Sequence, residues 1–128
     1  MKRLLSLILA AAVVFGILCN LLVSLGVLLA MSSKDTAGRL MGAFIPVSFF
    51  VICGFEHCVA NMYYIPAGMM AAANPAYAAL AVEAGLDLSV LTLSNFAITN
   101  LVPVTIGNII GGGGLGALMW FSHVRGKQ

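Results

Sequence analysis

Hydrophobic residues fall into three long runs along the chain, which cover about residues 4–31, 40–73 and 90–123. Two more polar segments, 32–39 and 74–89, separate these runs. A helix needs about 20 consecutive apolar residues to cross a bilayer. The pattern therefore predicts three transmembrane spans, a short polar turn after the first span and a small-residue loop after the second.

The composition strengthens this interpretation. Of the 128 residues, 62% are hydrophobic and only 8% are charged, whereas about a quarter of the residues in a soluble domain are charged. We expect an all-α integral membrane protein with one membrane domain over residues 1–128. The net charge of +2 gives no indication of nucleic acid as a partner.

The basic residues near the ends of the spans predict an orientation. One side of the membrane receives Lys34, Arg39, Arg125 and Lys127, and the other receives Lys2 and Arg3. The positive-inside rule then favours a cytoplasmic C-terminus and an N-terminus on the outside. We expect a multi-pass protein of the cell inner (plasma) membrane. A cleaved secretory signal is the alternative for the N-terminus, but the first apolar run continues far beyond the roughly 7–15 residues of the apolar region in such a signal.

The second run is longer than one helix requires, and polar or helix-breaking residues interrupt it: Pro46, Gly54, Glu56, His57, Asn61 and Pro66. A charge at the middle of a bilayer costs roughly 2.5–3.5 kcal/mol on insertion scales. We expect the helix to stop near Gly54 and to restart near Glu56 or His57, which would leave backbone N–H groups that attract an anion. His57 could add a proton donor. Alternatively, a neutral His57 simply bonds to Glu56 or to neighbouring backbone and holds the break together.

The third run carries a second set of polar and small residues. Pro103 removes a backbone donor and predicts a kink or break. Two glycine pairs, Gly107 with Gly111 and Gly112 with Gly116, have the spacing that lets membrane helices approach closely. Thr105 and Asn108 are expected to form hydrogen bonds between helices. Two interrupted spans in one chain are typical of a transport site.

Three stretches of the sequence, GILCNLLVSLGV, GFEHCVANMYYIPAG and SNFAITNLVPVTIGNIIGG, resemble the last three spans of the formate/nitrite transporter family in order and spacing. The resemblance implies that the chain is the C-terminal half of an aquaporin-like channel with inverted repeats. It also implies a homo-pentamer in which each protomer moves small monovalent anions or their acids. A full family member has about twice this length.

The resemblance also implies roles for individual residues. His57 matches the central pore histidine, which is thought to interact with the anion and protonate it. Asn20 matches an asparagine that hydrogen-bonds near this histidine, and Phe50 falls where the family has a bulky apolar constriction. The residues expected at the helix break and in its support are Gly54, Glu56, Asn61, Pro103, Thr105 and Asn108.

Several functions remain open at this stage. GFEHCVANMYYIPAG resembles formate-type members, so formate is favoured over nitrite and other weak-acid anions. The chain could instead be a truncated, non-transporting fragment, or a split subunit that needs a complementary N-terminal half. A metal or haem subunit would have to combine His57 with cysteines that form no CxxC pair, at positions 19, 53 and 58. We therefore expect no metal and no cofactor. No serine, histidine and acid arrangement indicates an enzyme.

Overall fold

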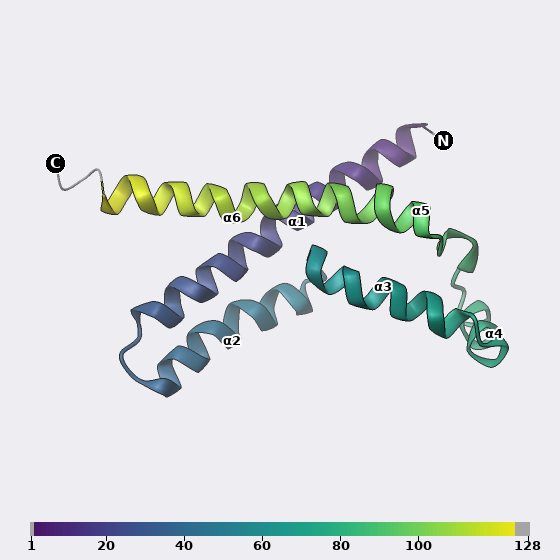
Figure 1. Cartoon of the computed structure of the whole chain (residues 1–128), viewed down its shortest axis with the longest axis horizontal. Coiled ribbons are helices and arrows are strands. Elements are labelled where there is room, and N and C mark those ends of the chain that lie inside the picture. The colour runs from purple at the N-terminus through teal and green to yellow at the C-terminus, as the bar shows by residue number, and fades with distance from the viewer. Residues whose placement is uncertain (1, 125–128) are drawn as a thin grey trace.

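The computed structural model describes residues 2–124; Arg125 and Lys127, which entered the predicted orientation, lie outside the described residues. Every regular element in this range is helical (Figure 1). The longer helices are α1 (Lys2–Ser32), α2 (Thr36–Ile52), α3 (Cys58–Ala72), α4 (Pro75–Glu83) and α6 (Val102–His123). Between α4 and α6 lie the 3₁₀ turn η1 (Leu88–Val90), the single turn α5 (Leu93–Asn95) and the π-helical segment η2 (Phe96–Leu101). The all-α fold class is confirmed.

The helices present their apolar side chains outward. Among the described residues, two continuous helical stretches are long and apolar enough to cross a membrane, Arg3–Ser32 and Leu93–His123. The buried hydrophobic residues are few: Ala12, Cys19, Phe50 and Val104. Large exposed apolar side chains are distributed along all the longer helices. Such surfaces are suited to lipid or to further protein and not to water.

The small core lies where α1 crosses α6, and glycines permit the close approach. A Cβ added at Gly107 would collide with the carbonyl oxygen of Val13, and one added at Gly111 would collide with that of Ile17. One added at Gly16 of α1 would lie 2.8 Å from the carbonyl oxygen of Val104. The backbones are therefore nearly in contact at Gly107 and Gly111, as their spacing predicts, whereas Gly116 of the second predicted pair has open space around it.

The polar turn after α1 is shorter than the sequence predicted. Asp35 ends it, because its Oδ1 accepts the N–H of Gly38 at 2.8 Å and so caps α2. α2 then returns beside α1, and α3 continues away from the break at residues 53–57 (Figure 1). The expected interruption of the second run is present, with a helix of 17 residues before it and one of 15 residues after it.

The expectation of a loop over 74–89 was only partly correct, because α4 occupies its first half. Asn74 caps this helix by accepting the N–H of Ala76 at 3.0 Å, and Pro75 stands in the first turn, where its missing N–H costs nothing. α4 is bent by 106° relative to α3. The local capping signals were visible in the sequence but the alanine-rich composition was interpreted as a loop.

The sequence predicted a kink or break at Pro103, but the third run continues past this residue without a break. Pro103 lies in the first turn of α6 and is buried, so it removes no α-helical hydrogen bond. The irregularity is the π-helical η2 immediately before it, and the helical path stays continuous through Leu93–His123. An insertion of one extra residue in the turn, rather than a gap, is how this span accommodates its proline.

Candidate functional site

The break after α2 is a glycine-terminated helix end. Gly54 has a φ of +66°, which is accessible to glycine at little cost. Its N–H donates to the carbonyl of Val51 at 3.1 Å, and the N–H of Phe55 donates to the carbonyl of Phe50 at 3.0 Å. This pair of bonds is the Schellman arrangement, and it satisfies carbonyls that would otherwise be exposed within the membrane.

His57 is the residue at which the helix restarts. It is the N-cap of α3, and its Nδ1 accepts the N–H of Val59 at 3.2 Å. Because Nδ1 is an acceptor here, a neutral ring carries its proton on Nε2. The sequence analysis offered a hydrogen bond from His57 to Glu56 or to neighbouring backbone. Nδ1 does bond to neighbouring backbone, at Val59. Among the described residues, no hydrogen bond joins His57 to Glu56.

Asn108 of α6 joins the two sides of the break. Only 4% of its surface is exposed. Its Oδ1 accepts the N–H of Cys58 at 3.0 Å, and its Nδ2 donates to the carbonyls of Glu56 at 3.0 Å and of Gly16 at 2.9 Å. One side chain thus holds both ends of the turn before α3 and ties them to α1. The expected free N–H groups at the start of α3 are therefore partly used by the protein itself.

Asn20 of α1 reaches the same network from the other direction. Its Nδ2 donates to the backbone carbonyl of Asn108 at 2.6 Å. The expected bond near the histidine is thus an indirect link, because Asn20 orients Asn108 and Asn108 holds the turn that carries His57. A Cβ added at Gly112 would come within 2.6 Å of the same Nδ2, so the glycine makes room for it.

A second polar cluster surrounds Glu56. Its Oε2 accepts from Nδ2 of Asn61 at 2.5 Å and from Nδ2 of Asn100 at 3.3 Å. Asn61 also donates to Oδ1 of Asn100 at 2.8 Å. Glu56 and Asn61 were expected to support the break, but Asn100 was not singled out as a site residue. Its signal was an amide in an apolar run, and η2 is the element that brings it to Glu56.

The remaining predicted residues have simpler environments. Phe50 is buried, and its ring centroid lies 5.8 Å from that of His57. Phe55, within the break, packs on Phe15 of α1 with centroids 5.9 Å apart. Thr105 donates to the carbonyl of Leu101 in its own helical path at 2.7 Å, so it forms no bond between helices. The expectation of an interhelical hydrogen bond is correct for Asn108 and wrong for Thr105.

A cavity of about 630 Å³ opens beside the Glu56 cluster. Asn100 lines it together with Asn95 and Thr99, and the apolar part of its wall comes from α1, α3 and the segment before η2. His57 does not line it. Within residues 2–124, no three His, Cys, Asp or Glu side chains gather in a way that could hold a metal ion.

A membrane-length helix that breaks in its middle, with buried amides across the break, is typical of helical membrane channels and transporters. The family model described as formate/nitrite transporter matches residues 2–122. The chain belongs to the formate/nitrite transporter family. This is a family of transport proteins and not of enzymes.

Relatives and a solved structure agree with this assignment. The formate channel FocA of Escherichia coli (strain K12) is 43% identical over 117 residues, which are 89% of this chain and 41% of that protein. A probable formate transporter of Methanothermobacter thermautotrophicus is 39% identical over 84% of this chain and 33% of that protein. A solved structure described as a pentameric formate channel with formate bound has a TM-score of 0.74 at 34% identity, covering 86% of this chain and 44% of the other. The chain thus spans less than half the length of these proteins.

Proposed function

We propose that this chain forms one half of a pore for small monovalent anions, with formate as the preferred substrate and His57 at its centre. The observation that carries the proposal is the break at residues 53–57, where His57 caps α3 beside the buried ring of Phe50. Membership of the formate/nitrite transporter family supports this role. The formate channels among the relatives support formate over nitrite.

The geometry suggests how the histidine would act. Nδ1 is engaged by Val59, so the neutral ring has Nε2–H to offer to an anion oxygen. Handing over a proton requires the doubly protonated ring, in which Nδ1 no longer accepts from Val59. An anion in an apolar constriction, which we propose Phe50 to form, gains from neutralisation, because transfer of a charge out of water is costly. Hydrogen bonding and protonation of formate are thus two successive uses of one side chain.

The proposed assembly is a homo-pentamer in which the three runs correspond to the last three of six spans. The solved structure described as a pentameric formate channel supports the oligomer. A complementary half with three further spans would supply the opposite wall of the pore. We propose an inner-membrane location with a cytoplasmic C-terminus. The turn between α1 and α2, which carries the basic residue Lys34, and the C-terminal end of α6 lie toward the same end of the molecule (Figure 1). The positive-inside rule places a basic turn on the cytoplasmic side.

Flux into liposomes tests the proposal. The chain is reconstituted alone and with the separately expressed N-terminal half of a full-length relative, and formate or nitrite uptake is followed with an internal pH dye. We expect formate flux to exceed nitrite flux. We also expect His57→Phe to abolish the flux of both anions without changing the insertion of the chain into the membrane. His123→Phe is the matched control, because His123 lies at the exposed end of α6.

Each outcome discriminates between functions. Undiminished flux in His57→Phe would refute the role of the histidine. Flux that requires the added half would identify a split subunit. No flux in either preparation, after insertion has been verified, would favour a non-transporting fragment. Faster nitrite than formate uptake would reverse the substrate assignment. Asn20→Leu should slow flux without abolishing it, because Asn20 acts through Asn108.

A further inference from the structure

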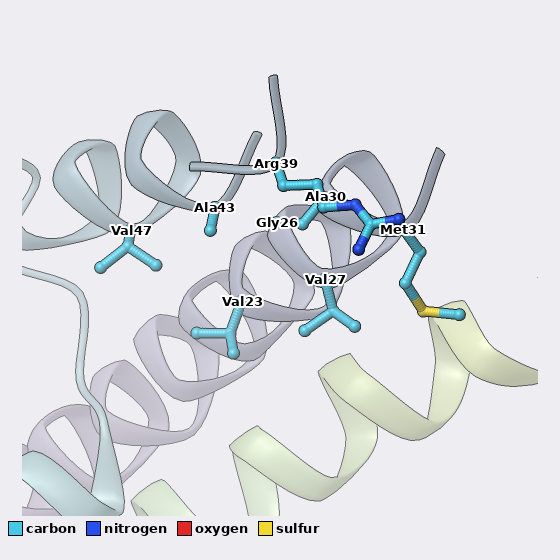
Figure 2. Close-up of a pocket in the computed structure, with 8 residues that line it drawn as sticks. All are labelled: Val23, Gly26, Val27, Ala30, Met31, Arg39, Ala43 and Val47. Carbon is cyan, nitrogen blue, oxygen red and sulfur yellow. The ribbon is translucent and has the colours of Figure 1, made fainter. Parts of the chain in front are cut away.

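A groove between α1 and α2 includes no residue of the helix break. It encloses about 590 Å³, and its walls are formed by Val23, Val27, Met31 and Val47. Figure 2 shows where these residues lie: Val47 projects from α2 on the side of α1, and Val23, Val27 and Met31 project from α1, with the Met31 side chain extending away from α2 at its end. Val27, Met31 and Val47 are more than a third exposed, so the described residues leave this apolar surface uncovered.

Small residues make the groove possible. Gly26 and Ala30 of α1 and Ala43 of α2 line it and lack the side-chain volume to fill the valley between the helices. The two backbones nevertheless approach closely, since a Cβ added at Gly42 would lie 2.9 Å from the backbone nitrogen of Ala30. The helices are therefore held together at this end, while the apolar groove remains along their junction.

The guanidinium group of Arg39 lies at the end of this groove. Arg39 lies in the first turn of α2 and lines the groove, and Figure 2 shows its guanidinium lying across the end of α1 near Ala30 and Met31. Its Nε donates to the carbonyl of Ser33 at 3.2 Å, which holds it in place. Within residues 2–124 it forms no ion pair, and Oδ1 of the neighbouring Asp35 accepts the N–H of Gly38.

We propose that the groove binds an acyl chain of an anionic phospholipid and that Arg39 binds the headgroup phosphate. The groove follows two membrane helices and ends at the polar turn after α1, where hydrocarbon gives way to headgroups. Guanidinium groups match phosphate oxygens in a bidentate manner, and basic pockets between membrane helices bind anionic headgroups. The apolar walls supply the complementary surface for the tail.

The shape of the site favours a lipid over other occupants. A free phosphate ion would use Arg39 and would not contact the apolar walls of Val23, Val27 and Val47. A helix from another protein would cover these walls but would leave the guanidinium unpaired unless it also brought a carboxylate. An anionic amphiphile satisfies both parts of the groove with one molecule. The inference is independent of the proposed anion pathway, because no residue of the groove belongs to it.

Native mass spectrometry of the purified full chain in mild detergent tests the proposal. Phosphatidylglycerol and phosphatidylcholine with identical acyl chains are added in equal amounts, and the bound lipid is identified. One basic group near an anionic headgroup is worth about a fivefold preference. We therefore expect phosphatidylglycerol to be retained about fivefold more, and Arg39→Gln to reduce the ratio to about one. Lys34→Gln is the matched control, because Lys34 lies in the polar turn just before α2 but does not line the groove.

A second variant tests the tail. Ala43→Phe fills the groove and should reduce retention of both lipids, whereas Ala37→Phe, outside the groove on the same helix, should not. Circular dichroism verifies that the helices remain. Equal retention of the two lipids, an equal loss in Lys34→Gln, or no retained lipid at all would overturn the proposal. The proposal would also be overturned if millimolar inorganic phosphate displaced the lipid and Ala43→Phe left lipid retention unchanged. That result would indicate a surface site for phosphate alone.

Discussion

The most informative single substitution is Asn108→Leu, which keeps the size of the side chain and removes its hydrogen bonds. Two backbone groups lose their partner, the N–H of Cys58 and the carbonyl of Glu56. The carbonyl of Gly16 lies inside α1 and keeps its place in the hydrogen bonding of that helix. Loss of its bond from Asn108 should therefore contribute little. The perturbation is therefore confined to the restart of the broken helix.

The magnitude follows from the cost of two unpaired groups. Hydrogen bonds between membrane helices contribute about 0.6 kcal/mol on average and up to about 1.7 kcal/mol. Two of them give about 1–3 kcal/mol, which corresponds to an equilibrium change of roughly 5- to 150-fold. Local opening at the start of α3 should increase by this factor, because Oδ1 of Asn108 accepts the Cys58 N–H.

Amide hydrogen exchange of the ¹⁵N-labelled chain in micelles measures this opening residue by residue. We expect exchange at Cys58 to accelerate roughly 5- to 150-fold in Asn108→Leu. Thr105→Val is the control one turn earlier on α6, because the hydroxyl of Thr105 bonds only to a carbonyl of its own helical path. Unchanged exchange at Cys58 in the leucine variant, or equal acceleration in the valine variant, would refute the assignment of Asn108 as the clamp of the break.

Three further substitutions test the packing, the turn and the second cluster. Gly111→Ala should lower the thermal unfolding midpoint because its Cβ meets a carbonyl of α1, while Gly113→Ala, with open space around it, should leave the midpoint unchanged or higher; equal effects would refute the close approach. Gly54→Ala should destabilise the break by about 1–2 kcal/mol because of its positive φ, and neutral behaviour in a denaturant titration would contradict this. Asn100→Leu should weaken the clamp on Glu56 and reduce formate flux, whereas wild-type flux would limit Asn100 to local packing.

Much of the fold could be anticipated from local features of the sequence. The three apolar runs, the break at Gly54 and the restart at His57 follow from hydropathy, a residue that tolerates positive φ and polar side chains that cannot remain in hydrocarbon unsupported. The glycine spacing of α6 also predicted its close contact with α1. Local signals were less reliable where composition concealed them, as in α4, whose capping residues Asn74 and Pro75 stand in an alanine-rich segment.

The candidate site was anticipated in its members and not in its connections. Glu56, His57, Asn61 and Asn108 were all recognised as polar residues in apolar runs. Their partners were not, since Asn108 reaches Gly16, which is 92 positions away in the sequence. The role of Asn100 likewise depends on the π-helical turn that rotates it toward Glu56. No local pattern specifies such pairings.

The amino-acid sequence alone was sufficient to define a three-run membrane protein with a polar break in its second run, because hydrophobicity and backbone preferences act over a few residues. Only the tertiary structure decided which buried amide satisfies which backbone group. That choice depends on the crossing of α1 and α6, where glycines allow near-contact of the backbones and so bring Asn20 and Asn108 to the turn before α3. The broken helix is thus encoded locally and held in place by residues from distant parts of the chain.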